Sequence, residues 1–210
     1  MFNDRTDAGI QLAAKLSYLE NENVVVLAIP RGGLPVADPV AKVLNAPLDI
    51  VLTKKIGHPF HKEYAIGAVS LENEVLSDTA QISSAYITEE IKTIRDKLRA
   101  RYEQYYKDAE PVNLKNKTVI IIDDGIATGN TILVTVALIM KQQPKAIIVA
   151  IPVAPPSAIR NLERHPNIDD VVCLETPINF RAVGQYYETF EQVSDEEAIA
   201  ILEAHRNLTH

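Results

Sequence analysis

Two adjacent acidic residues directly follow a short apolar run in the middle of the sequence. The run 119–122 is followed by Asp123 and Asp124. The next residues, mostly small or hydroxyl-bearing, are Gly125, Ile126, Ala127, Thr128, Gly129, Asn130 and Thr131. A helix that begins behind such a loop offers free N–H groups and partial positive charge to a phosphate. Because two acids would repel that phosphate, we expect them to face vicinal hydroxyls, or a metal bound to those hydroxyls.

A sugar phosphate, with its phosphate in the loop and its diol on the acids, fits this order of strand, diacid, loop and helix. One alternative is merely a strand with a polar end and a capped helix, since Asp-Gly and Thr-Gly are common in turns. Another is the acidic strand of a P-loop ATPase. The chain has no Gly-x-x-x-x-Gly-Lys-Ser/Thr sequence to cradle a nucleotide, which disfavours the ATPase.

A second candidate phosphate-binding turn follows the apolar run 24–29. It contains Arg31, Gly32 and Gly33. An arginine here either pairs with a nearby surface acid or contacts phosphate. We favour phosphate, because guanidinium binds phosphate oxygens through two parallel hydrogen bonds.

Basic and histidine side chains follow the next expected strand. Lys54 and Lys55 would point to opposite sides of a strand, so we expect only one of them to reach a ligand. His58, His61 and Glu63 have a spacing that a metal could use, but no helix would fix them. We favour a catalytic role for this segment or a role as a lid that excludes water.

The elements that position these residues alternate between apolar runs and helical patterns, which predicts parallel βαβ units. The expected strands are 24–29, 49–53, 118–122, 146–153 and 170–174. The expected helices are 7–19, one ending near Leu44, 88–107 capped by Thr88, 129–142, 157–164, and one opened by a capping box at Ser194. Pro39 would remove a backbone hydrogen bond, so we expect the second helix to begin late or to kink.

The whole chain, residues 1–210, is expected to form one domain with an insertion. Residues 54–85 lack helical periodicity and contain two short strand candidates, 65–71 and 74–76, so we predict a mobile hairpin there. Residues 176–210 form an irregular aromatic tail and a last helix. Cys173, the single cysteine, lies in an apolar run and is expected to be a packing residue rather than a nucleophile.

Composition restricts the partners and the compartment. With 21 basic and 28 acidic residues the net charge is −7, which argues against unspecific nucleic-acid binding. The apolar runs are far shorter than the roughly 18 residues of a membrane span, and the first residues show no secretory signal. We therefore expect a cytoplasmic protein with a small-molecule substrate and without nucleic-acid or membrane partners.

The stretch 119–131 resembles the phosphoribosyl-pyrophosphate signature of the type I phosphoribosyltransferases. The family implies a five-stranded parallel sheet flanked by helices, a mobile hairpin, and a C-terminal hood that selects the acceptor. It also implies that Asp123 and Asp124 bind the ribose 2- and 3-hydroxyls. The resemblance further implies that the 5-phosphate binds to the loop and the helix start. The residues concerned are Ala127, Thr128, Gly129, Asn130 and Thr131.

Other stretches extend the resemblance over nearly the whole chain. Arg31, Gly32 and Gly33 resemble the family's pyrophosphate loop, and Lys54 and Lys55 resemble a basic pair that faces pyrophosphate. Similarity to a less characterised subgroup of these transferases is carried by residues 4–9, 27–37, 55–57, 66–69 and 182–187. One departure is the stretch Gly125, Ile126 and Ala127, where many transferases have a β-branched residue at the first place and Thr or Ser at the third. Ala127 leaves the phosphate one hydroxyl donor fewer, but the backbone donors remain.

The resemblance implies transfer of 5-phosphoribose from phosphoribosyl pyrophosphate to a nitrogen nucleophile, with inversion and release of pyrophosphate. Positive charge develops on the ring, as in glycosidases, and the two acids would stabilise it. Mg²⁺ is the implied cofactor, held by substrate oxygens and water, with any contact to Asp123 or Asp124 made through water and no direct protein ligand. A homodimer is also implied.

The sequence leaves the acceptor and the alternatives to this reaction open. The tail aromatics either stack on an acceptor ring or pack a subdomain; they are Phe180, Tyr186, Tyr187 and Phe190. A non-catalytic sensor of phosphoribosyl ligands would keep the same residues, because a fold does not decide function. A hydrolase or phosphorylase acting on the same sugar phosphate is a third possibility.

Overall fold

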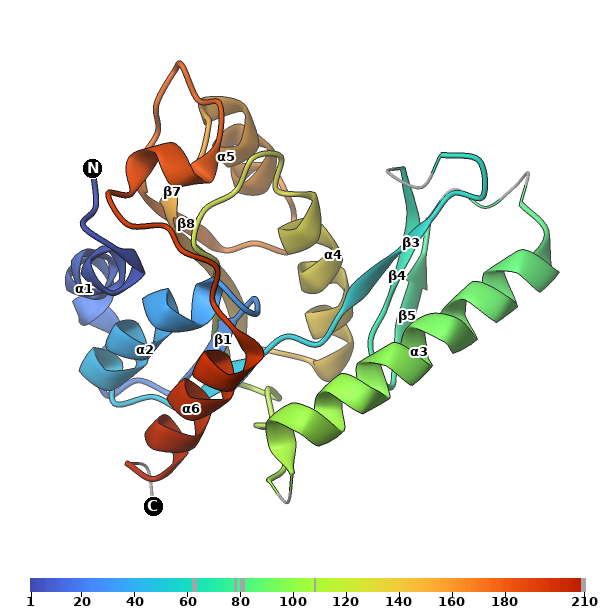
Figure 1. Ribbon diagram of the computed structural model, residues 1–210, viewed down its shortest axis with the longest axis horizontal. Helices are drawn as coiled ribbons and strands as arrows, with labels where there is room; N and C mark the ends of the chain where they lie inside the picture. The colour runs from blue at the N-terminus through green and yellow to red at the C-terminus, as the bar shows by residue number, and fades with distance from the viewer. Residues whose placement is uncertain (62–63, 78, 80–81, 108, 209–210) are drawn as a thin grey trace. The chain divides into compact units, whose positions relative to one another are not determined.

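The computed structural model describes residues 1–61, 64–77, 79, 82–107 and 109–208. The chain forms two compact units (Figure 1). The first contains Met1–Val51, Val112–Gly129 and Gln143–His210, and the second contains Leu52–Pro111 and Asn130–Gln142.

The first unit is built on a five-stranded parallel sheet. In spatial order its strands are β2 (Leu48–Ile50), β1 (Val24–Ala28), β6 (Thr118–Ile122), β7 (Ala146–Val153) and β8 (Asp170–Glu175). Every residue of β1 is buried, as is typical of continuous apolar runs in parallel sheets. The predicted sheet is confirmed, although β2 begins and ends earlier than the predicted 49–53.

Helices flank this sheet. They are α1 (Arg5–Leu16), α2 (Gly33–Leu44), α5 (Pro156–Glu163) and α6 (Asp195–Arg206), with the short 3₁₀ helices η1 (Ser17–Leu19) and η3 (Val183–Tyr186). The helices α1 and α2 pack on one another, and α6 packs on α2 and β2 (Figure 1). Gly9 permits the close approach of α1 to α2, because a Cβ there would overlap the Val36 carbonyl oxygen.

Pro39 led us to predict that the second helix either begins late or is kinked. The late start is wrong. The helix starts at Gly33 and includes Pro39. The buried residues on its inner face include Leu34, Val36 and Val40. Burial of these side chains outweighs the loss of one backbone hydrogen bond at the proline.

The second unit combines an antiparallel sheet with two helices. Its elements are β3 (Lys54–Gly57), β4 (Ala65–Val69), β5 (Glu74–Leu76), α3 (Ser84–Tyr106), α4 (Asn130–Ile139) and the 3₁₀ helix η2 (Met140–Gln142). The predicted hairpin is confirmed as β4 and β5, and β3, which was not predicted, pairs with β4. Within the described residues no helix is both long and apolar enough to cross a membrane.

The start of α3 differs from its prediction. Thr88 lies inside the helix, and the N-cap is Ser83, whose hydroxyl accepts a hydrogen bond from the Tyr86 N–H at 3.2 Å. The additional turn contains Ile87, which is buried in an apolar cluster with Ile56 and Ile66 of the sheet. This burial favours the earlier of two possible caps.

Candidate functional site

The two acids lie at the carboxyl end of β6, directly after Ile122. One oxygen of the Asp123 carboxylate accepts a hydrogen bond from the Asp124 N–H at 2.9 Å. Burial, and then the neighbouring charge of Asp124, raise the pKa of Asp123 well above its usual range. The surroundings of Asp123 therefore favour its neutral form more than water does.

Asp124 is held by an arginine that the sequence analysis did not assign to the site. Arg5 Nε lies 2.8 Å from Asp124 Oδ2, and Arg5 Nη1 donates to the Glu191 carbonyl at 2.7 Å. The guanidinium carbon lies 3.9 Å from the centre of the Phe190 ring, within the range of a cation–π interaction. The only sequence signal was the similarity of residues 4–9, to which no role was attached.

Local structure places Arg5 in the first turn of α1. The Asp4 carboxylate caps the helix by accepting a hydrogen bond from the Asp7 N–H at 2.8 Å. The cap fixes the start of α1, and the packing of Gly9 on α2 fixes its position. Arg5 is therefore presented from a rigid element rather than from a loose terminus.

The tail also contacts Asp124. The Tyr187 hydroxyl donates a hydrogen bond to the Asp124 carbonyl oxygen at 2.5 Å, and burial raises the pKa of Tyr187. The Tyr187 ring packs between Phe2 and Phe190, with ring centres 5.3 and 5.0 Å away. Tyr187 and Phe190 therefore have packing contacts within the chain, while stacking of a tail ring on an acceptor stays a prediction.

The loop after the acids is anchored on β7. The Ile126 N–H donates to the Val153 carbonyl at 3.1 Å. Gly125 has a φ of 151° and Gly129 a φ of 79°, and both values favour glycine. The exposed residues of the loop and helix start are Ala127, Thr128, Asn130 and Thr131. The helix α4 begins at Asn130, so the predicted order of strand, diacid, loop and helix is confirmed.

The turn at Arg31 packs on the same acids. The peptide bond between Pro30 and Arg31 is cis. A Cβ on Gly32 would overlap Asp124 Oδ2, and one on Gly33 would lie 2.7 Å from the Ile122 carbonyl oxygen. Only glycine allows this approach, which brings the two predicted glycine turns together. Arg31 Nη1 lies 3.6 Å from an Asp195 carboxylate oxygen, so Arg31 has an acidic neighbour as well.

Lys54 and Lys55 belong to the second unit. Both side chains are exposed on β3, opposite Val69 and Ala68 of β4 respectively. Whether either contacts a ligand stays a prediction.

The remaining residues singled out from the sequence are the histidines and Glu63 of the insertion, and Cys173. The rings of His58 and His61 stack with centres 5.6 Å apart, while Glu63 lies outside the described residues. In the described part of the chain no three His, Cys, Asp or Glu side chains are placed to hold a metal ion. Burial raises the pKa of the Cys173 thiol to about 11, which suits a packing residue better than a nucleophile.

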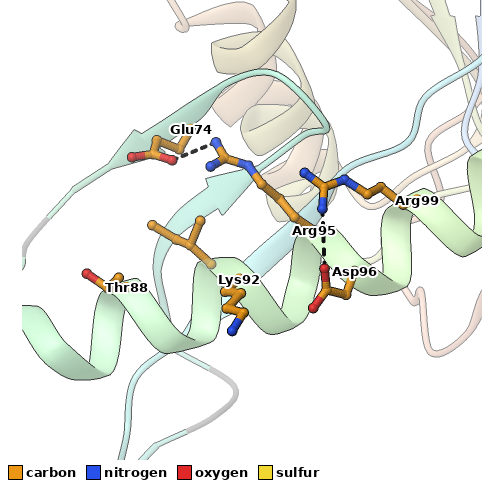
Figure 2. Close-up of a pocket in the computed structure, with 7 residues that line it drawn as sticks. Glu74, Thr88, Lys92, Arg95, Asp96 and Arg99 are labelled. Atoms are coloured by element: carbon orange, nitrogen blue, oxygen red, sulfur yellow. Dashed lines mark hydrogen bonds and ion pairs between the residues drawn. The ribbon is translucent and has the colours of Figure 1, made fainter.

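A pocket in the second unit gathers charges from α3 and β5 (Figure 2). Arg95 pairs with Glu74 at 2.7 Å, and Arg99 pairs with Asp96 at 3.4 Å. These ion pairs balance much of the positive charge that lines the pocket, and we assign it no ligand.

Known proteins match almost the whole chain. The family model described as "Phosphoribosyl transferase domain" matches residues 3–190. Two Mycobacterium tuberculosis sequences, from strains H37Rv and CDC 1551 and both named "Putative phosphoribosyl transferase", are 39% identical over 99% of this chain and 48% of theirs. The chain thus spans about half the length of these curated relatives. It belongs to the phosphoribosyltransferase family, as the resemblance implied.

A more distant relative is also named a phosphoribosyltransferase, and one solved structure shares the fold of nearly the whole chain. A uracil phosphoribosyltransferase of Malacoplasma penetrans is 25% identical over 84% of this chain and 67% of its own. The crystal structure of TT1426 from Thermus thermophilus aligns with a TM-score of 0.88 and 40% identity, covering 96% of this chain and 97% of that one.

Proposed function

We propose that the chain transfers 5-phosphoribose from phosphoribosyl pyrophosphate to a nitrogen nucleophile, with inversion and release of pyrophosphate. The observation that carries this proposal is the diacid at the end of β6, followed by a glycine-containing loop and the start of α4, in a member of this family. The acceptor is a base or an amine.

Each part of the site has a separate role in the proposal. Asp123 and Asp124 bind the ribose diol and stabilise the positive charge that develops on the ring. The loop and helix start bind the 5-phosphate through backbone N–H groups and hydroxyls. They comprise Ala127, Thr128, Gly129, Asn130 and Thr131.

Pyrophosphate is assigned to the turn at Arg31, Gly32 and Gly33, with one of Lys54 and Lys55. The arginine is partly exposed, and its 3.6 Å separation from Asp195 is longer than a hydrogen bond. A surface pair of this kind contributes little to stability, so phosphate oxygens can compete with it.

Mg²⁺ fits this donor set only as an ion that arrives with the substrate. The diacid offers carboxylate oxygens, which suit magnesium, but one oxygen of Asp124 is already held by Arg5. Asp123 would therefore hold the ion through water, and the ion would neutralise charge on the pyrophosphate.

Incubation with phosphoribosyl pyrophosphate, Mg²⁺ and a panel of purines, pyrimidines and amines tests the proposal. We expect acceptor-dependent release of pyrophosphate, measured by a coupled phosphate assay. Ribose 5-phosphate formed without an acceptor would instead identify a hydrolase, and a requirement for inorganic phosphate would identify a phosphorylase.

The alternative is a non-catalytic sensor of phosphoribosyl ligands. The ion pair between Arg5 and Asp124 favours this alternative. The Arg5 cation offsets part of the negative charge of Asp124, and that charge would otherwise stabilise a positively charged transition state. Binding of phosphoribosyl pyrophosphate without pyrophosphate release under any acceptor would support the sensor.

A further inference from the structure

We infer that Arg5 is a positioning residue that orients Asp124 toward the ribose diol. The inference rests on the proposed function, because it assigns a role to Arg5 at the same site. It also accounts for the contacts that Arg5 and Tyr187, near the two ends of the chain, both make with Asp124.

The geometry divides the two oxygens of Asp124 between protein and ligand. Oδ2 accepts from Arg5 Nε at 2.8 Å and faces the space that a Cβ on Gly32 would occupy. Oδ2 is thereby enclosed by protein on two sides. The second oxygen, Oδ1, is the one left to accept a hydrogen bond from a ribose hydroxyl.

Arginine is required for this arrangement because its contacts use separate parts of one planar group. Nε binds Asp124, Nη1 binds the Glu191 carbonyl, and the face of the guanidinium covers Phe190. A lysine ammonium is a single point charge and cannot make these contacts together. The Arg5 side chain is only 11% exposed, so it is held in this position.

Asp124 is fixed at its backbone as well as at its side chain. The Tyr187 hydroxyl binds its carbonyl oxygen, and the Asp123 carboxylate binds its N–H. An aspartate held by Arg5 at its carboxylate and by two hydrogen bonds at its backbone is oriented before a ligand arrives, and such pre-organisation is what a site for a reacting sugar needs. An ion pair that served only stability could be replaced by apolar contacts at little cost.

Titration calorimetry with phosphoribosyl pyrophosphate and Mg²⁺ tests the inference in a double-mutant cycle. The variants are Arg5→Ala, Asp124→Asn and the double substitution. If Arg5 acts through Asp124, Arg5→Ala weakens binding about tenfold in the wild-type background but less than about twofold in the Asp124→Asn background. Lys15→Ala, which removes an exposed cation from the same helix, is the control and leaves affinity unchanged.

Arg5→Lys keeps the positive charge and provides a second test if the alanine variant does not fold. We expect it to recover only part of the affinity, with an unchanged thermal unfolding midpoint. Equal losses from Arg5→Ala in both backgrounds, no loss in either, or full recovery by lysine would overturn the inference while leaving the proposed function intact. A wild-type chain that binds no phosphoribosyl pyrophosphate would overturn the proposed function and the inference together.

Discussion

Asp123 and Asp124 are adjacent in sequence but have different surroundings. Asp124 is paired with Arg5, whereas Asp123 is held by a backbone N–H, and its pKa is raised by burial and by its neighbour. We therefore assign them different sensitivities to substitution and to pH. Their types and positions were predictable from sequence, but this difference depends on residues far away along the chain.

Replacing Asp124 with asparagine tests the role of its charge. Asparagine can still accept a hydrogen bond from Arg5, so the fold and the unfolding midpoint should change little. Turnover should fall about a hundredfold or more, because the variant lacks a carboxylate beside the developing positive charge. Pyrophosphate release and thermal unfolding, measured on the same sample, separate the two effects. Unchanged turnover would remove the mechanistic assignment.

The raised pKa of Asp123 predicts a pH-dependent cost to stability. Between the usual pKa of this carboxyl, 3.8, and its higher folded value, the folded state binds more protons than the unfolded state. Stability contributed by this group therefore falls as pH rises through that window. Asp123→Asn should gain in unfolding midpoint relative to the wild type as pH rises above the usual pKa of 3.8 and through that window.

The control for this pH series is Glu20→Gln, an exposed acid on the same unit. It should follow the wild-type curve throughout. A midpoint difference between Asp123→Asn and the wild type that stays flat with pH would contradict the expected titration of Asp123.

At the scale of elements, the loop from Gly125 to Gly129 differs from the family pattern at Ala127. This residue is exposed, so a hydroxyl can be added there without displacing a neighbour. Ala127→Ser should tighten binding of ribose 5-phosphate by about three- to tenfold, since a hydrogen bond to a charged group is stronger than a neutral one. Calorimetry would measure this change, and weaker binding would argue against a phosphate at the loop.

The capping of α3 provides a test that is independent of any ligand. Ser83→Ala should destabilise the chain by about 1 kcal/mol, because it removes the hydroxyl that accepts from the Tyr86 N–H. Thr88→Ala is the matched control, since Thr88 lies inside the helix and alanine favours helices. Denaturant unfolding should rank the variants in that order, and the reverse order would restore Thr88 as the cap.

Strands were easier to predict than helix starts. The buried runs of β6 and β7 are continuous and apolar, so their bounds follow from composition alone. Helix starts depended on which of several possible caps tertiary packing selects, as Ser83 and Pro39 show. The strand β3 was missed because its first two residues are exposed lysines, and their pairing with β4 is a non-local contact.

At the scale of the whole chain, residues from both ends of the sequence contact Asp124, Arg5 at its carboxylate and Tyr187 at its backbone carbonyl oxygen. Arg5 is 119 positions from Asp124, and Tyr187 is 63 positions from it. Periodicity and spacing carry no information on contacts at such separations, so the sequence indicated the acids, the loop after them and the glycine turns as candidates but did not indicate Arg5. The homodimer stays a prediction of the family resemblance, and the sequence left the identity of the acceptor open.

The ribose diol is the group that Asp123 and Asp124 are proposed to bind. Calorimetry with ribose 5-phosphate and with 2-deoxyribose 5-phosphate measures the contribution of the diol to binding, because the two ligands share a phosphate and differ in one hydroxyl. We predict that ribose 5-phosphate binds at least about tenfold more tightly, as expected for a hydroxyl that donates to a carboxylate. Equal affinities, or no binding of either sugar phosphate, would contradict the assignment of Asp123 and Asp124.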